Sequence, residues 1–192
     1  ASRSSAPGGG SVSAVLAALG VGLASMVAKL THGVRKFEPV QAEMEKVIPS
    51  LHHTVRELIP MIDADTSAFN EFMKGLRMPR NTEEERTLRQ EKMQSGLKTA
   101  IKVPLTTMRL GDSVWPQLLD VARHGNPASK SDTQVGARSL EAGIWGAYQN
   151  VLINMTDIDD NAFRKEVLGE ASAIMSRAED NCREVLKVVD EI

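Results

Sequence analysis

The chain has 192 residues, of which 42% are hydrophobic and 25% charged, a composition typical of globular proteins and not of disordered or fibrous ones. A net charge of -2 and an aromatic content of 4% argue against nucleic-acid binding, because phosphate contacts need a basic surface and base stacking needs aromatic side chains. The single cysteine, Cys182, excludes an internal disulfide, a zinc finger and an iron–sulfur cluster, and we expect no metal site.

The first predicted element is a helix over residues 11–31, which contains the longest apolar run of the chain. Residues 12–28 approach the short limit of a membrane span, but they are mostly Ala, Gly, Ser and Val, so the driving force for insertion is weak. We interpret them as a helix buried within a soluble bundle. Residues 1–10 form a predicted loop, and Ser11 is the predicted N-cap of the helix.

A second helix is predicted over residues 38–76, because apolar residues recur there at spacings of three and four. Pro49 and Pro60 lie inside this pattern, and we expect kinks at both but no end of the helix.

The third helix begins at a predicted capping box formed by Thr82 and Glu85. We expect it to run to about residue 103, where Pro104 bends or breaks it, and to continue over about 105–123 with a break near Pro116.

Two more helices are predicted, over about 132–155 and 160–190, after a loop that contains Asn126. The connections are short, so neighbouring helices should be mostly antiparallel. The sequence therefore predicts one all-α domain over 1–192, a bundle of about five long, partly kinked helices.

One acidic residue stands out on the second helix. At about 100° per residue, Asp65 falls inside the apolar stripe that contains Leu58 and Phe69, whereas Asp63 falls towards its edge. A carboxylic acid among core positions is a candidate proton donor near neutral pH. The alternative is a structural role, with the carboxylate paired with an arginine or bonded to a helix end.

The predicted fourth helix has a second face opposite its apolar stripe. This face carries small and neutral polar residues where a solvated face would carry Lys and Glu: Asp132, Gly136, Ser139, Gly143, Gly146, Asn150 and Asn154. Either another helix packs closely against it, or it lines a ligand groove with amide hydrogen-bonding groups.

Two further segments have an alternative reading as ligand sites. Gly8, Gly9 and Gly10 with Ser11 precede a helix. The two alternatives are an anion site formed by their backbone N–H groups and a flexible segment that leads into the helix. A basic cluster of Lys29, Arg35 and Lys36 is either a solvated turn or the site of a carboxylate-rich ligand tail.

Eight segments resemble the cyclodeaminase domain of formimidoyltransferase-cyclodeaminases, especially the animal bifunctional enzymes. They occur in order across nearly the whole chain: APGGGSVSA (6–14), LASMV (23–27), DADTSAF (63–69), LRMPRNTEEER (76–86), VPL (103–105), WPQL (115–118), GNPASKSDTQV (125–135) and GAYQNVLIN (146–154). The resemblance implies an all-helical, dimeric fold and a longer bifunctional chain whose other domain is a formimidoyltransferase.

The resemblance also implies an activity in histidine degradation and one-carbon metabolism. The expected enzyme is an ammonia-lyase that closes 5-formiminotetrahydrofolate to 5,10-methenyltetrahydrofolate and releases ammonia, with a folate polyglutamate as substrate and no tightly bound cofactor. The alternatives are a methenyltetrahydrofolate cyclohydrolase of the same family and a non-enzymatic helical scaffold. We expect a homodimer formed through helices, a higher oligomer in the full-length enzyme, a cytosolic location, and no membrane or nucleic-acid partner.

Residue roles follow the same resemblance. Asp65 matches the family's proton donor, and Gly8 to Ser11 would present N–H groups to the substrate. By charge, the basic cluster of Lys29, Arg35 and Lys36 would meet the glutamate carboxylates. Asn154 is the predicted contact to the pterin edge, Asn126 a further predicted substrate contact, and Asp132 a candidate for the base at N10 by position alone.

Overall fold

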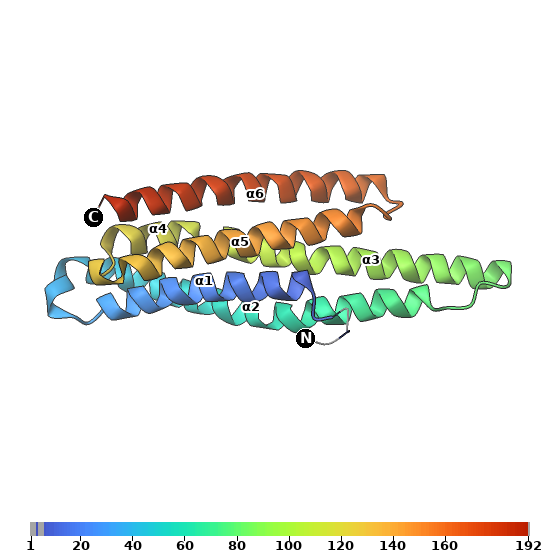
Figure 1. Ribbon diagram of the computed structural model, residues 1–192, viewed down its shortest axis with the longest axis horizontal. Coiled ribbons are helices and arrows are strands. Elements are labelled where there is room, and N and C mark those ends of the chain that lie inside the picture. Colours follow the sequence, from blue (N-terminus) through green and yellow to red (C-terminus); the bar gives the residue numbers. More distant parts are fainter. Residues whose placement is uncertain (1–2, 4–5, 192) are drawn as a thin grey trace.

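A computed structural model describes residue 3 and residues 6–191 of the chain, and among these residues there are helices and no strand. Six α-helices and two short 3-10 helices follow one another: α1 (Gly9–Thr31), η1 (Arg35–Val40), α2 (Gln41–Leu76), α3 (Glu83–Asp112), α4 (Trp115–His124), η2 (Pro127–Ser129), α5 (Lys130–Met155) and α6 (Asn161–Asp190). The five long helices lie roughly along one axis (Figure 1). The prediction of an all-α bundle is confirmed.

Helix α1 lies between α2 and α5, which supply most of its contacts (Figure 1). Its length and composition alone would allow it to cross a membrane, but 61% of its most apolar window is buried inside the bundle. The expected packing of residues 12–28 as a bundle helix is thereby confirmed.

The start of α1 differs from the prediction. The helix begins at Gly9, with Gly8 as an N-cap that has no side-chain hydrogen bond, so Gly9 and Gly10 belong to the first turn and not to a loop. Ser11 is not the N-cap, because its hydroxyl is directed at another helix. Gly10 allows this first turn to pack directly on α2, because a side chain at this position would not fit.

The capping box at the start of α3 is confirmed, with both reciprocal bonds of Thr82 and Glu85 present. The prediction that α3 ends at about residue 103 is wrong, since the helix runs through Pro104 to Asp112. A proline cannot bond the carbonyl four residues back, here that of Ala100, but the Asn154 side-chain amide donates to this carbonyl at 3.4 Å. The freed acceptor therefore has a partner, and the helix continues.

The other boundaries are close to those expected. Helix α2 continues through Pro49 and Pro60 as predicted, but residues 35–40 before it form a separate 3-10 helix, so α2 starts at Gln41 and not at 38. The predicted break near Pro116 is confirmed, because α4 starts at Trp115 with this proline in its first turn.

Helices α1 and α5 approach each other through glycines. A Cβ atom added at Gly143 would lie 2.5 Å from the Ala17 nitrogen and 2.8 Å from the Ser13 carbonyl oxygen, both backbone atoms of α1. The small face of α5 is thus covered by a closely packed helix of the same chain. This observation favours the packing interpretation of that face over most of its length.

The close approach predicts a stability difference between two glycine substitutions. Gly143→Ala should lower the free energy of unfolding by about 1–3 kcal/mol, because the backbone of α1 must move. Gly169→Ala is the matched control, since nothing lies within 4 Å of its added Cβ on α6, and it should raise the free energy of unfolding by about 0.5–1 kcal/mol. Urea unfolding of both variants checks this; equal effects would show that α1 and α5 are not in such close contact.

Cys182 belongs to the core, as predicted, and is fully buried on α6. Burial, together with a hydrogen bond to Glu141, raises the pKa of its thiol to about 12. The thiol therefore stays protonated and is a packing group.

Candidate functional site

Asp65 lies on α2 beside the first turn of α1. The Ser11 hydroxyl lies 2.9 Å from Asp65 Oδ2, 3.0 Å from the Ile62 carbonyl oxygen and 3.3 Å from the Thr66 hydroxyl. The segments that these bonds join are 51 to 55 residues apart in sequence. The structure thus brings the predicted acid and the glycine-rich segment together.

Asp65 is half-buried, and Asp63 is exposed. The sequence prediction placed Asp65 inside the apolar stripe of α2. It lies instead beside the first turn of α1, where that helix begins at Gly9 while α2 continues beyond it (Figure 1), so its side chain is only partly covered. The carboxyl group is bonded to a helix end, as the structural alternative required, and its half-burial also keeps it within reach of a ligand.

Gly10 is buried directly against the Asp65 carboxyl group. A Cβ atom added at Gly10 would overlap Oδ1, and it would also come within 2.9 Å of Oδ2. Only glycine fits between this carboxyl group and the helix. The first turn of α1 carries backbone N–H groups without a helical partner, and the positive end of the helix dipole favours a negative charge.

Asn150 completes this group of residues from α5. Its side-chain nitrogen would lie 3.3 Å from a Cβ added at Gly9, and it donates to the Gly146 carbonyl at 2.8 Å. Sequence reasoning placed Asn150 on the small polar face but did not select it as a site residue. The available signal was its position one turn before Asn154 on that face.

Asn154 lies one turn further along α5 and is half-buried. Its amide nitrogen donates to the Ala100 and Asn150 carbonyls, at 3.4 and 2.9 Å. The nitrogen thus has a structural task that follows from Pro104. The contact of Asn154 with the pterin edge stays a prediction, and the side-chain oxygen is the atom that would make it.

The basic cluster lies at the other end of α1. Lys29 is exposed in the last turn of the helix, and Arg35 and Lys36 are exposed in η1. Eighteen residues separate Ser11 from Lys29, which is about 27 Å at the usual helical rise. Within one chain, the cluster is therefore not brought to Asp65.

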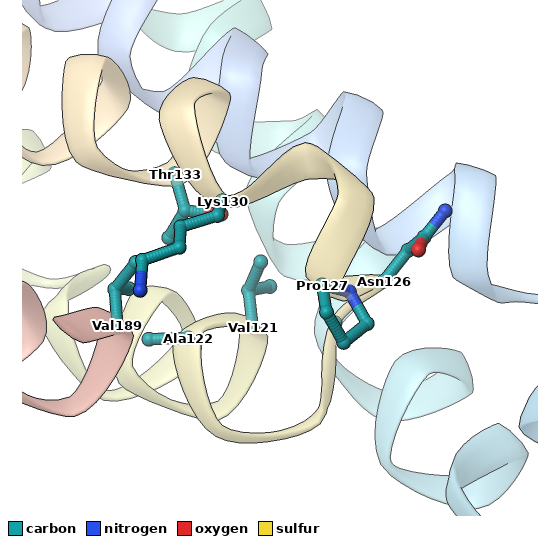
Figure 2. A pocket seen from close by; sticks show the side chains of 8 residues that line it. Val121, Ala122, Asn126, Pro127, Lys130, Thr133 and Val189 are labelled. Atoms are coloured by element: carbon teal, nitrogen blue, oxygen red, sulfur yellow. The ribbon is translucent and has the colours of Figure 1, made fainter. Parts of the chain in front are cut away.

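Asn126 and Asp132 lie at the same far end. The Asn126 backbone N–H donates to the Thr31 hydroxyl at 2.8 Å, and its side chain accepts from Ala128 N–H at 3.0 Å, so it caps η2. Asn126 also lines a small cavity with Lys130, Thr133 and Val189 (Figure 2). The cavity measures about 10 Å³, which has room for no more than a water molecule.

Asp132 lies in the first turn of α5. It is eighteen residues before Asn150, about 27 Å along the helix, so one chain does not place it beside Asp65. Its candidacy as the base at N10 has no support from this geometry.

Comparison with known proteins shows the family of the chain. The family model described as formiminotransferase-cyclodeaminase matches residues 1–173. The chain belongs to this family. The chicken formimidoyltransferase-cyclodeaminase is 44% identical over 98% of the chain, and that of Dictyostelium discoideum is 43% identical over 98%. The chain spans about a third of the length of these relatives, 35% and 34%.

Two family relatives are close to this chain in length. The crystal structure of formiminotetrahydrofolate cyclodeaminase from Thermotoga maritima superposes with a TM-score of 0.86 at 30% identity, covering 99% of this chain and 91% of that one. A methenyltetrahydrofolate cyclohydrolase of Methylorubrum extorquens is 38% identical over 93% of this chain and 86% of its own length. The family therefore includes proteins named for each of the two reactions considered above.

Proposed function

We propose that the chain is a formimidoyltetrahydrofolate cyclodeaminase domain, which converts 5-formiminotetrahydrofolate to 5,10-methenyltetrahydrofolate and ammonia. The observation that carries the proposal is the half-buried Asp65 carboxyl group, held on the first turn of α1 by Ser11 beside Asn150. The similarity to the Thermotoga maritima cyclodeaminase over 99% of the chain supports the choice of substrate.

The reaction needs a proton to move between two nitrogens of the substrate. N10 attacks the carbon of the protonated formimino group and forms a tetrahedral centre. N10 then loses its proton, the exocyclic nitrogen gains one and leaves as ammonia, and the positive charge stays on the methenyl product. One carboxyl group can carry out both transfers, because the proton removed from N10 is the one that the leaving nitrogen requires.

We assign both transfers to Asp65. It accepts the proton from N10 as a carboxylate and donates it to the leaving nitrogen as a carboxylic acid. We expect Asn150 and the amide oxygen of Asn154 to orient the folate ring system. This assignment removes the need for Asp132 as a separate base.

A direct assay tests the activity. The purified chain is mixed with 5-formiminotetrahydrofolate, and the methenyl chromophore and ammonia are followed together. Equal rates for both products support the cyclodeaminase. A folded wild-type chain that forms neither product from this substrate contradicts it.

The cyclohydrolase is the second candidate, because the Methylorubrum extorquens relative of similar length carries that name. In that reaction water attacks the methenyl carbon and the ring opens to the formyl product. Loss of the methenyl chromophore without ammonia would identify it, so the same protein is assayed with each folate alone. The scaffold alternative requires that both assays fail.

We also propose that the chain is a homodimer through α1. A stripe of apolar side chains is exposed on one side of this helix, whereas its other apolar residues are buried or half-buried. The stripe contains Val12, Val15, Leu19, Met26 and Leu30, which are 36% to 57% exposed. Gly22 interrupts this α1 stripe, with nothing within 4 Å of an added Cβ. Exposed apolar surface of this kind marks interfaces.

A second copy fits the stripe when the two helices run antiparallel. A groove of about 380 Å³ lies beside Gly22, Met26 and Leu30 on one half of α1, and Leu19 projects from the other half. A two-fold axis near Gly22 places each Leu19 against the groove of the other copy, which is the self-complementarity that such a dimer requires.

This pairing also gives the basic cluster a role. It places Leu30 of one copy opposite Val12 of the other, so the cluster of Lys29, Arg35 and Lys36 lies near the Asp65 end of the second copy. Exposed Asp63 lies at that end, so the charges are complementary. Glutamate carboxylates of the folate would then bind the cluster of the partner.

Mixed dimers test this arrangement. We expect a mixture of Asp65→Asn chains with Lys29→Ala/Arg35→Ala/Lys36→Ala chains, refolded together, to show a low-KM activity on polyglutamylated substrate that neither parent shows. Only the mixed dimer contains a site with Asp65 and an intact basic cluster from the other chain. Kinetics equal to the sum of the parents would mean that the cluster does not act across the interface.

The relatives from chicken and Dictyostelium discoideum are about three times as long as this chain, and their names include a formimidoyltransferase. We propose that this chain is the C-terminal part of such a bifunctional protein, which assembles into a higher oligomer in the cytosol. The transferase would supply the formimino group that this domain consumes.

A further inference from the structure

We infer that Ser11 is a positioning residue for Asp65 and not a contact to the substrate. The inference deepens the proposed function and rests on Asp65 as the proton-transfer group. Ser11 is only 2% exposed, so a ligand cannot reach its hydroxyl without moving the helix. All three hydrogen-bonding partners of that hydroxyl lie on α2.

The Ser11 hydroxyl has one proton, and both the Asp65 carboxylate and the Ile62 carbonyl lie within bonding distance as acceptors for it. The charged Asp65 carboxylate, at 2.9 Å, attracts the proton more strongly than a neutral carbonyl does. When Asp65 is protonated, its oxygen becomes a weaker acceptor, and the Ile62 carbonyl at 3.0 Å is the alternative. The Thr66 hydroxyl at 3.3 Å can donate to Ser11 in both states.

Ser11 therefore has a partner in each protonation state of Asp65. The Ser11 hydroxyl is not left unpaired as Asp65 gains and loses its proton. An unpaired buried hydroxyl would make one of the two protonation states of Asp65 less favourable. A group that must accept and then donate a proton needs such surroundings.

Gly10 and Ser11 together fix the direction of the carboxyl group. Ser11 bonds Oδ2, and Gly10 leaves room for Oδ1 against the helix. A carboxyl group free to rotate would spend only part of its time in this orientation.

Ser11→Ala and the matched control Ser13→Ala test the inference. Both serines are 2% exposed on α1, but the Ser13 hydroxyl donates to the Gly9 carbonyl of its own helix at 2.7 Å. We expect Ser11→Ala to lower kcat about tenfold with KM within about twofold of the wild type. Ser13→Ala should leave both constants within about twofold.

The double variant separates positioning from substrate contact. If Ser11 acts through Asp65, then Ser11→Ala has no further effect on the residual activity of Asp65→Asn. A raised KM in Ser11→Ala, with a loss that multiplies that of Asp65→Asn, would overturn the inference and assign Ser11 to the substrate.

A measurement without turnover keeps this inference distinct from the proposed function. In protein labelled with ¹³C at aspartate carboxyl groups, the Asp65 signal is identified by its loss in Asp65→Asn. We expect Ser11→Ala to move this signal and Ser13→Ala to leave it in place. An unchanged signal in Ser11→Ala overturns the inference even if the enzyme is active, whereas a wild type that is inactive on both folates overturns the proposed function alone.

Discussion

Replacing Asp65 by Asn is expected to lower kcat for methenyl formation by about a thousandfold, in the range measured for lost general acid–base groups. Asparagine has the same shape and its side-chain oxygen still accepts from Ser11, so the contact to the first turn of α1 is kept. The amide cannot take up the proton of N10 and return it to the leaving nitrogen. Substrate binding should therefore change much less than kcat.

Asp63→Asn is the control for this prediction. Asp63 lies two residues away on the same helix, carries the same charge and is exposed. Its replacement should leave kcat within about twofold, since general electrostatic effects of an exposed charge are small. Equal losses in the two variants would show that the charge of this region matters and that Asp65 transfers no proton.

Replacing Leu19 by Arg is expected to dissociate the proposed homodimer. Leu19 is 57% exposed near the centre of the α1 stripe, and with the two-fold axis near Gly22 each copy would contribute one charge to an apolar contact. An unpaired buried charge is strongly unfavourable, so the dissociation constant should rise by at least about a hundredfold. Sedimentation equilibrium should show the mass fall from twice the chain mass to the 20.9 kDa of one chain.

Leu88→Arg provides the comparison. Leu88 is 48% exposed, but it lies on α3, outside the α1 stripe. This variant should keep the wild-type mass. A wild type that is already monomeric, or a dimer that Leu19→Arg leaves intact, would show that the stripe has another partner.

Much of the fold could be read from local patterns. The capping box of Thr82 and Glu85, the apolar spacing of residues 41–76 and the break before Pro116 depend on neighbours within one or two turns. Pro104 shows where such reasoning fails. The proline predicts a break at about residue 103, but Asn154, fifty residues later in the chain, donates to the carbonyl that the proline leaves free.

For the candidate site, too, local patterns predicted some features and not others. The helical projection separated Asp65 from Asp63, because the periodicity of a helix decides which residues share a face. It could not show that α1 begins at Gly9 and leaves Asp65 only half-buried. The sequence-based assignment of Lys29, Arg35 and Lys36 by charge, of Asp132 by position and of Asn126 as a substrate contact joined these residues to an acid that lies near the other end of α1.

The sequence by itself determined the all-helical class, the approximate positions of most helices and the residue types of the glycine-rich segment and its acid. Hydrophobic spacing and capping are local, so the order of residues is sufficient for them. Only the tertiary structure decided that Ser11 and Gly10 meet Asp65, which is 54 residues away from Ser11. That contact depends on how α1 packs between α2 and α5, and the packing is set by small residues on several helices at once, which no single stretch of the chain contains.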